Sequence, residues 1–400
     1  MKLVKRILIV LVVLAVLSQV PFAYRRYVFG ETAGKIEADN GARRHVEDPR
    51  FDEYTGIIHA HSAIGGHSNA TFDELISGAN AVGLNFIVMT EHWSDAFDTS
   101  AMTLSGFHGS TLFVAGNEID TADDDRMLMV PGSADAASLR RLSTRDVVKK
   151  LHDEKRLALV TYPERFHSWR ADIDGVEVFN LHTAAKNINR LTALFDLIWS
   201  GSSYPELVFA RSFTRPDENL AKFDSYAAED KATLFAGTDA HSNIGFYLLG
   251  DETGHRFFGV KLDPYERMFR ILHVHTLIPK GTPLTQENLL AAIADGRVFV
   301  GIDALGDSSG FRFRFGDRTM GERASIAESV ALTVDLPLKS RVILYKNGQK
   351  AAESSGNDHF EFKPDGPGVY RVEVYREGLG MAYQAMPWIM SNPIYIAPAS

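Results

Sequence analysis

Three histidines lie close together near the start of the chain, in the segment GIIHAHSAIGGHS at residues 56–68. They are His59, His61 and His67, and they directly follow a short apolar run. Imidazole nitrogens are good ligands for transition metals, and in a strand two histidines separated by one residue point to the same side. Both can therefore reach one ion, but a metal site here needs further ligands from elsewhere in the chain.

Other histidines and acidic residues follow later apolar runs in the same way. They occur in the segments MTEHWS, AGNEID and AGTDAHS. If these runs are strands of one parallel β/α fold, their carboxyl ends face the same way and build one site. We therefore predict a single metal site formed by His59, His61, His67, His92, Glu118, Asp239 and His241.

This set of side chains indicates both the metal and its chemistry. Imidazole together with carboxylate suits Zn, Mn or Fe better than Ca or Mg. A carboxylate such as Glu118 can bridge two ions, and two ions about 3.5–4 Å apart can hold a hydroxide and bind a phosphoryl group. A second His-x-His, formed by His273 and His275, has no acidic or histidine partner near it in the sequence pattern. We predict that this second pair binds no metal.

Between about residues 52 and 305, predicted strands alternate with predicted helices. The strands are TGIIHAH, LNFIVMT, TLFVAGNEI, LALVTYP, GVEVFN and ATLFAGT. The segment TFDELISGANAVG predicts a helix that is capped by Thr71 and Glu74 and ends at Gly83. This alternation is typical of parallel β/α units. Residues 306–400 alternate at period two, with a hairpin signal at Asn347-Gly348, and predict a small antiparallel β-sandwich.

The first 26 residues are hydrophobic and flanked by basic residues. Ile7–Leu17 is an unbroken aliphatic run, and an 18-residue helix beginning at Ile7 would span roughly 27 Å, enough to cross the hydrocarbon layer. Signal cleavage after Ala23 would place Pro21 at the −3 position, which normally holds a small residue. We therefore predict a retained single-pass anchor in the cell membrane, with the rest of the chain outside the cytoplasm. The alternative is secretion after signal cleavage.

These observations divide the chain into four parts. We expect an anchor over residues 1–26, a polar linker over 27–51, a β/α domain over 52–305 and the β-sandwich over 306–400. The chain contains no cysteine, which excludes disulfides, thiolate metal sites and a cysteine nucleophile. Its formal net charge of −9 argues against non-specific binding to nucleic acid.

The segments HAHS, TEH, GNE, GVEVFN and GTDAH, in this order, resemble the polymerase and histidinol phosphatase (PHP) family over about residues 52–305. The resemblance implies a distorted seven-stranded (β/α)7 barrel with two or three metal ions that hydrolyses phosphoesters. It places His59, His61, Glu118 and Asp239 at a first metal site. It places His67, His92 and His241 at another site.

One part of the family pattern is missing from this chain. The family has a His-Pro where this sequence reads VTYPER, so Tyr162 stands in place of a histidine ligand. The segment DRMLMVPG, where another ligand is expected, also lacks histidine. His167, five residues after Tyr162, is a candidate substitute, although an ordinary surface position is the favoured interpretation. We therefore expect two ions rather than a full set of three.

The sequence thus predicts a membrane-tethered, metal-dependent phosphoesterase in which a metal-bound hydroxide attacks phosphorus. The candidate catalytic residues are His92, Asp239 and His241, with His92 or His241 protonating the leaving oxygen. Arg165, Tyr162 and Asn180 are weaker candidates for contact with a small phosphorylated substrate.

Two other interpretations remain open at this stage. An amidohydrolase-type barrel that acts on C–N or C–O bonds also begins with His-x-His and ends with a late aspartate, but gives no reason for TEH or for the histidine of TDAH. Alternatively, a degenerate barrel keeps metal for structure while the β-sandwich binds a partner in the cell envelope.

Overall fold

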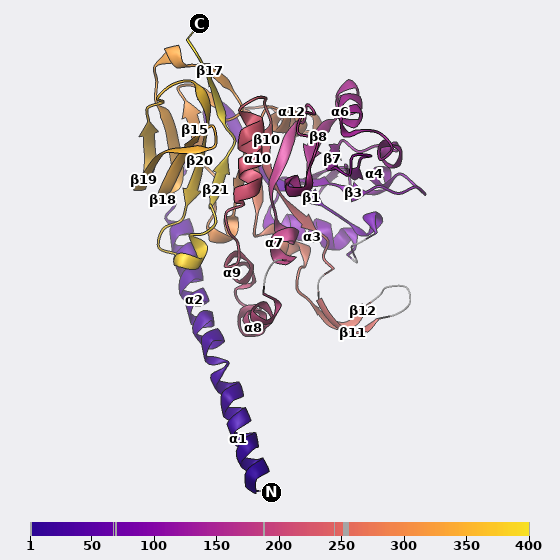
Figure 1. The fold of residues 1–400 in the computed structure, drawn as a ribbon, viewed down its shortest axis with the longest axis vertical. Coiled ribbons are helices and arrows are strands. Elements are labelled where there is room, and N and C mark those ends of the chain that lie inside the picture. The colour runs from indigo at the N-terminus through magenta and orange to yellow at the C-terminus, as the bar shows by residue number, and fades with distance from the viewer. Residues whose placement is uncertain are drawn as a thin grey trace.

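The computed structural model describes residues 2–399 except for residues 67, 69, 187, 188, 244 and 251–255. It shows a body of helices around a large sheet, from which a long N-terminal helix projects (Figure 1). This helix comprises α1 (Lys2–Leu17) and α2 (Val20–Gly41), separated by a turn. α1 has no buried residue, and the helix is long and apolar enough to cross a membrane. The predicted apolar helix is therefore present.

The linker predicted over residues 27–51 differs from the structure, because α2 continues to Gly41. Phe29 and Thr32 on α2 are buried, and Asp39 accepts a hydrogen bond from Arg376 near the end of the chain. These contacts come from segments far apart in the sequence, so the local apolar pattern does not show them.

The centre of the sheet is a closed ring of strands. Its members are β1 (Phe51–Ala60), β2 (Phe86–Met89), β3 (Glu91–His92), β5 (Thr111–Val114), β6 (Asn117–Asp120), β7 (Arg126–Val130), β8 (Leu157–Val160), β9 (Gly175–Asn180) and β10 (Thr233–Ala240). β5, β2, β1, β10, β9 and β8 pair in parallel, and β7 joins β8 to β6 through antiparallel pairs. If β2 with β3 and β5 with β6 are each counted as one interrupted strand, the described pairings close a ring of seven strands. The mixed α/β class predicted from the sequence is confirmed.

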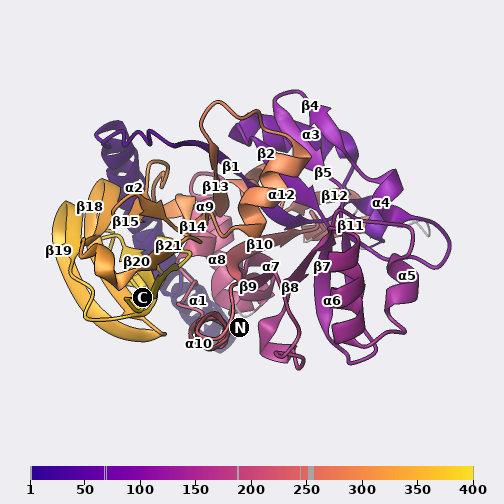
Figure 2. The ribbon, with the colours of Figure 1, turned by 90° about the horizontal axis from the view of Figure 1, so that it is seen from above.

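Helices surround this ring (Figure 2). They are α3 (Phe72–Val82), α4 (Thr99–Met102), α5 (Ala136–Leu139), α6 (Thr144–Asp153), α7 (Leu181–Lys186), α8 (Arg190–Ser200), α9 (Pro205–Ala210), α10 (Asp217–Ala227), α11 (Tyr265–Phe269) and α12 (Gln286–Ala294). α3 begins and ends as predicted: Thr71 accepts a hydrogen bond from the amide of Glu74, and Gly83 adopts a left-handed φ of 79°. The side chain of Glu74 does not complete a capping box; it accepts hydrogen bonds from Ser242 and Lys261 instead.

Most of the remaining strands extend the sheet on one side of the ring, from β13 onward, whereas β4 pairs with β5 of the ring, and β11 and β12 form a separate hairpin. The remaining strands are β4 (Gly106–His108), β11 (Gly245–Gly250), β12 (Arg256–Lys261), β13 (His273–Pro279), β14 (Val298–Gly301), β15 (Arg312–Phe315), β16 (Arg318–Thr319), β17 (Arg323–Ser325), β18 (Leu332–Lys346), β19 (Gln349–Phe362), β20 (Gly368–Tyr375), β21 (Ile389–Ser391) and β22 (Ile394–Ala397). The hairpin signal Asn347-Gly348 connects β18 and β19, with positive φ at both residues, as this turn type requires.

The strands after residue 306 are joined to the ring rather than separate from it. β13 pairs with β1, β14 with β13, and β21 with β14. Trp388 is fully buried, and Asn392 makes three hydrogen bonds to the main chain of Leu234 and Val298. The predicted antiparallel strands are therefore present, but they share a core with the barrel instead of forming an independent accessory unit.

Candidate metal centre

The ends of β1 and β10 are irregular where their candidate ligands lie. The parallel pairing of Ile58 with Gly237 shifts before Ala60 pairs with Ala240, so His59 lies in an irregular step. His59 has φ 69° and Asp239 has φ 48°. Such angles are unfavourable for residues other than glycine and persist only where the surrounding structure enforces them. The sequence rule of alternating side chains along a regular strand therefore does not explain how His59 is placed.

Four buried side chains from three strands direct one atom each toward a common point. The Nε2 atom of His59 lies 3.7 Å from Glu118 Oε2 and 3.6 Å from Asp239 Oδ1. The Nε2 atom of His61 lies 3.5 Å and 3.3 Å from the same two oxygens. None of these four atoms has a hydrogen-bond partner among the described residues, although all are buried.

Buried polar atoms normally have a partner, so four that converge without one require an explanation. Donors about 2.1 Å from a tetrahedrally coordinated ion are about 3.4 Å apart, which matches the observed spacing. Imidazole and carboxylate donors together suit a transition metal. The residues therefore fit a metal ion of this kind.

Two further predicted ligands complete the cluster. His92 Nδ1 lies 3.1 Å from Glu118 Oε2, and His241 Nδ1 lies 3.3 Å from Asp239 Oδ1. The His61 ring stacks with the rings of His92 and His241, with centroids 4.6 Å and 4.3 Å away, and the His92 and His241 rings lie 6.1 Å from each other. These three histidines are close enough to hold an ion. The structure thus brings together six of the seven predicted ligands, and His67 lies outside the described residues.

Glu177 is a member of the site that the sequence analysis missed. It is buried in the middle of β9, and its Oε1 accepts a hydrogen bond of 2.7 Å from His59 Nδ1. This bond places the lone pair of a neutral His59 ring on Nε2, toward the other donors, and raises its basicity as a ligand. The signal was a lone glutamate inside the apolar strand GVEVFN, where a buried carboxylate needs a partner.

Tyr162 and Asn180 hold the other oxygen of Asp239. The Tyr162 hydroxyl donates a hydrogen bond of 2.7 Å to Asp239 Oδ2, and the Asn180 amide donates to the same oxygen at 3.3 Å and to Glu177 at 3.2 Å. Burial and the nearby carboxylates raise the pKa of Tyr162, so the phenol keeps its proton and acts as a donor. Tyr162 therefore lies at the metal centre, but it contacts Asp239 rather than Glu118.

The charges of the cluster favour a bound cation. Burial opposes a charge on His59, but the carboxylates of Glu177 and Asp239 outweigh it and raise its pKa well above the ordinary value. Burial and the neighbouring histidines lower the pKa of His61 to about 3, so this ring is neutral and available as a ligand. Glu118, Glu177 and Asp239 bring three carboxylates into a buried space, which attracts positive charge.

The cluster opens into a cavity of about 530 Å³. Its walls include Trp93, Asp120, Arg126, Tyr162 and His182 beside the candidate ligands. Arg126, at the start of β7, was missed in the sequence; its guanidinium lies 3.6 Å from Glu118 Oε1 and 2.8 Å from Asp120 Oδ1.

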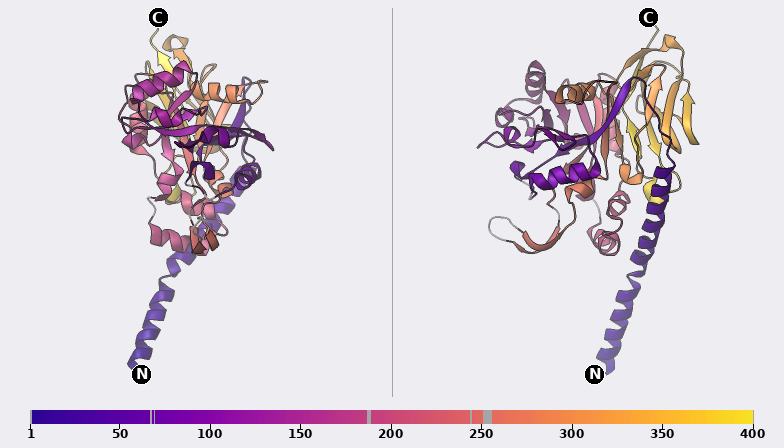
Figure 3. Two further views of the ribbon diagram at one scale, coloured as in Figure 1. Left: turned by 90° about the vertical axis from the view of Figure 1, so that its right-hand side faces the viewer. Right: turned by 180° about the vertical axis from the view of Figure 1, so that it is seen from behind.

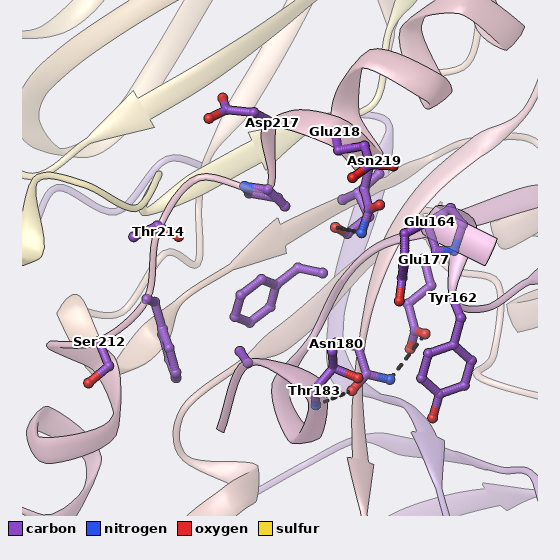
Figure 4. Close-up of a pocket in the computed structure, with 16 residues that line it drawn as sticks. Tyr162, Glu164, Glu177, Asn180, Thr183, Ser212, Thr214, Asp217, Glu218 and Asn219 are labelled. Carbon is purple, nitrogen blue, oxygen red and sulfur yellow. Dashed lines mark hydrogen bonds between the residues drawn. The ribbon is translucent and has the colours of Figure 1, made fainter. Parts of the chain in front are cut away.

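Tyr162 also lines a second, neighbouring pocket of about 320 Å³ (Figure 4). Glu177 and Asn180 lie on the same side of that pocket as Tyr162, and acidic residues such as Asp217 and Glu218 lie farther along it. Arg165, a predicted substrate contact, is exposed on the 3-10 turn after Tyr162 and is not part of the described walls of either cavity.

Two other residues near the candidate ligands have different roles. Glu91, which precedes His92, accepts hydrogen bonds from the amides of Ser62 and Gly65 and from the hydroxyl of Thr103. Its buried carboxylate thus fixes the loop after β1. His167 is 65% exposed and contacts Asp125, in agreement with the surface position favoured from the sequence.

The second His-x-His has a different environment. His273 contacts Asp303 at 2.7 Å and a main-chain carbonyl at 2.6 Å; His275 contacts Glu53 at 2.8 Å and Ser308 at 3.0 Å. The pair does have acidic partners, contrary to the sequence-based reason, because Glu53 and Asp303 come from distant segments. With Asp303 it is close enough to hold an ion, but all four ring nitrogens already have partners. That it binds no metal stays a prediction.

This network predicts a loss of stability at alkaline pH. Burial lowers the pKa of His275. The hydrogen bonds and charges of Asp303 and Glu53 outweigh this effect and raise the pKa to about 9. The pKa of His275 is higher in the folded chain than in the unfolded chain, where it is about 6.5. The proton on His275 therefore stabilises the fold fully below pH about 6.5, and this stabilisation is lost as the pH rises through about 9. The free energy of unfolding should therefore fall by about 3 kcal/mol over this range.

Urea denaturation of the full-length chain between pH 6.5 and 9.5 measures this effect. His275→Gln should remove most of the fall, whereas the control His108→Gln, a histidine on a surface hairpin, should leave it unchanged. Equal slopes for the parent and His275→Gln would show that His275 is not charged in the folded chain.

Tyr162→His should increase the number of bound metal ions per chain. The substitution places an imidazole beside Asp239, where the parent has a phenol that only donates a hydrogen bond. Titration with Zn or Mn, followed by elemental analysis, measures the stoichiometry. Equal numbers for parent and variant would show that this position does not limit metal binding.

Glu177→Gln should weaken metal binding by about 10–100-fold, the usual effect of losing a carboxylate that orients a histidine ligand. The amide still fits beside His59 but no longer supplies a negative charge. Glu164→Gln is the matched control, because Glu164 is an exposed carboxylate in the neighbouring pocket. Competition with a fluorescent chelator gives both affinities, and equal affinities would exclude this role for Glu177.

No protein-family model matches this chain, and no curated protein sequence matches it. Three solved structures show a weak likeness. PsfC from Pseudomonas syringae PB-5123 matches with a TM-score of 0.36 and 10% identity, over 59% of this chain and 87% of that chain. Endonuclease Q in complex with a 27-mer duplex containing an abasic lesion matches with a TM-score of 0.36 and 12% identity, over 60% of this chain and 56% of that chain. The lesion-specific endonuclease PfuEndoQ from Pyrococcus furiosus matches with a TM-score of 0.36 and 11% identity, over 61% of this chain and 56% of that chain. Because these scores are low, we base the function of this chain on its own residues.

Proposed function

We propose that this chain is a metal-dependent phosphoesterase of the PHP type, held at the cell membrane by its N-terminal helix. The observation that carries the proposal is the convergence of four buried donor atoms without hydrogen-bond partners among the described residues, from His59, His61, Glu118 and Asp239. The segments HAHS, TEH, GNE and GTDAH, which resemble the PHP family, supply these residues in the family's order.

These four residues and the pair His92 and His241 would hold Zn, Mn or Fe, in two sites rather than three. Such ions supply Lewis acidity toward a phosphoryl oxygen and make water more acidic. Glu177 would keep the His59 Nε2 atom available as a ligand, and the Tyr162 hydroxyl would fix Asp239 through its other oxygen.

Other residues of the cavity would act on a small phosphorylated substrate. Arg126 would bind the phosphoryl oxygens, because a guanidinium matches their geometry. Burial lowers the pKa of Arg126, but the carboxylates of Glu118 and Asp120 outweigh this effect and raise it, so the guanidinium stays charged. His92 and His241 both line the cavity, and either could deliver a proton to the leaving oxygen. The Nδ1 atom of His241 donates to the carbonyl oxygen of Asp239 at 2.8 Å, so its Nε2 atom would either hold an ion or exchange a proton, and the two roles exclude each other.

The cellular location is part of the same proposal. α1 would be retained and cross the membrane once, because the apolar run lacks good cleavage chemistry, and the barrel would lie on the outer side. A reporter enzyme fused after Ser400 tests this orientation. Activity of the fusion only in the cytoplasm would contradict export, whereas a mature chain that begins near residue 24 would contradict only the retained anchor.

The activity is tested with the purified full-length chain after reconstitution with Zn, Mn or Fe. We expect at least one ion per chain and metal-dependent hydrolysis of an aryl phosphate. Preference for an aryl ester or lactone would favour the amidohydrolase alternative. Tight metal binding without turnover of any phosphoester in a broad panel would favour a metal site of structural importance only.

A further inference from the structure

The candidate metal centre lies toward the end of the body from which α1 projects. β1, β8, β9 and β10 pair in parallel, so their carboxyl ends, which carry the candidate ligands, lie together. α7 directly follows β9, and the hairpin of β11 and β12 follows β10. α8 and this hairpin lie at the same end of the body as the projecting α1 in all the side views (Figures 1 and 3).

α8 is attached to the N-terminal helix just beyond its apolar run. Trp199 donates a hydrogen bond of 3.1 Å to Gln19, the Phe195 ring lies 4.9 Å from the Phe22 ring, and Asp196 accepts a hydrogen bond of 2.6 Å from Arg25. The predicted crossing segment of 18 residues from Ile7 ends at Tyr24, directly before Arg25, and Gln19 lies five residues before its end, a helical rise of about 8 Å. If this segment crosses the membrane, the second half of α8, which makes these contacts, lies at the boundary between the hydrocarbon core and the lipid headgroups.

One face of α8 is apolar and exposed. Leu191 and Ile198 are 66% and 67% exposed, and their spacing of seven residues places them on the same side of the helix. Asp196 and Ser200 lie buried on the other side. An amphipathic helix of this kind is stabilised at a lipid interface, where its apolar side chains leave water.

The segment that carries this helix also contributes to the metal cavity. His182 on α7, the helix that precedes α8, lines the cavity, and its ring lies 5.3 Å from the His241 ring. The wall of the cavity and the apolar face of α8 therefore belong to consecutive helices, on the side of the body from which α1 projects.

We propose that α8 lies in the headgroup layer and that the substrate is a phosphoester carried by a membrane lipid. The hydrolysis rests on the proposed function, whereas the position of α8 does not. In the reaction, a water oxygen forms a bond to phosphorus and the bond from phosphorus to the lipid oxygen breaks. The lipid leaves as an alcohol after taking up a proton, and the phosphate keeps the oxygen of water.

The position of α8 is tested by spin labelling, which the absence of native cysteine makes specific. Leu191→Cys and the control Phe107→Cys, whose side chain is 58% exposed on β4, are labelled in the full-length chain in nanodiscs of phosphatidylcholine and phosphatidylglycerol. For each spin label we compare the rate of collision with oxygen, which enters the membrane, with the rate of collision with a water-soluble nickel chelate. We expect the ratio of the first rate to the second to be at least fivefold higher for the label at position 191 than for the label at position 107. Equal ratios at the two positions would overturn the proposal.

The substrate class is tested in the same nanodiscs with dioleoyl phosphatidic acid or phosphatidylglycerol as lipid substrates and glycerol 3-phosphate and an aryl phosphate as soluble ones. We expect one of the lipids to be hydrolysed at least tenfold faster than glycerol 3-phosphate at equal bulk concentration. The double variant L191E/I198E should lower lipid turnover at least fivefold, and Phe107→Glu should not.

Neither variant should change turnover of the aryl phosphate more than twofold, which also shows that both are folded. Turnover of the aryl phosphate without preference for either lipid would overturn the lipid proposal and leave the proposed function intact. If the metal-loaded parent hydrolysed none of these substrates, the proposed function would be contradicted, and the spin-label ratios would still decide the position of α8.

Discussion

Replacing His59 and His61 together by alanine is expected to empty the first metal site and to lower phosphoester turnover at least a hundredfold. The double variant removes two buried imidazole nitrogens, each of which lies 3.3–3.7 Å from the carboxylate oxygens of Glu118 and Asp239. The first site would keep only these two carboxylates, beside His92 and His241 of the other site, and two ligands hold a transition metal far more weakly than four. Elemental analysis after gel filtration measures the loss of metal directly.

The chain provides a matched control in its second His-x-His. Replacing His273 and His275 by alanine removes the same residue types at the same spacing, but these rings are hydrogen-bonded to Asp303, Glu53 and Ser308. This control should lose stability and keep its metal per folded chain. Metal loss from the control rather than from the first pair would show that the metal centre has been assigned to the wrong histidines.

Truncation after residue 305 is expected to prevent cooperative folding. The deletion removes β21, the hydrogen-bonding partner of β14, and exposes to water the apolar core that residues 306–400 share with the ring. It also removes Arg371, which holds Asp224 through two hydrogen bonds, and Asn392, which holds the main chain of Leu234 and Val298. Each large apolar side chain that becomes exposed costs about 1.5–3 kcal/mol, so a few of them approach the whole stability of a typical domain, about 5–15 kcal/mol.

Near-ultraviolet circular dichroism and thermal unfolding of the truncated chain test this expectation. A milder comparison is Asn392→Ala in the full-length chain, which should remain folded and lose about 3 kcal/mol of unfolding free energy, because three main-chain hydrogen bonds are lost. A truncated chain with a sharp unfolding transition would show that residues 306–400 are, after all, an independent unit.

The elements and most of the candidate ligands could be predicted from the sequence. The strands before His59, Glu118 and Asp239 are recognisable because fully buried strands of parallel sheets are continuous apolar runs, and polar residues that interrupt such runs at their ends stand out. The helix from Thr71 to Gly83 and the hairpin at Asn347 are likewise encoded locally, by a capping side chain and by residues that tolerate positive φ.

Which of these residues meet, and how their hydrogen bonds are satisfied, is visible only in the folded chain. There Glu177 holds His59, Tyr162 contacts Asp239, and the second His-x-His is paired with Glu53 and Asp303. Residues after 306 also belong to the same core. The periodicity of a sequence reports which face of an element is buried, whereas these partners of buried polar atoms lie 30 to 222 residues away along the chain.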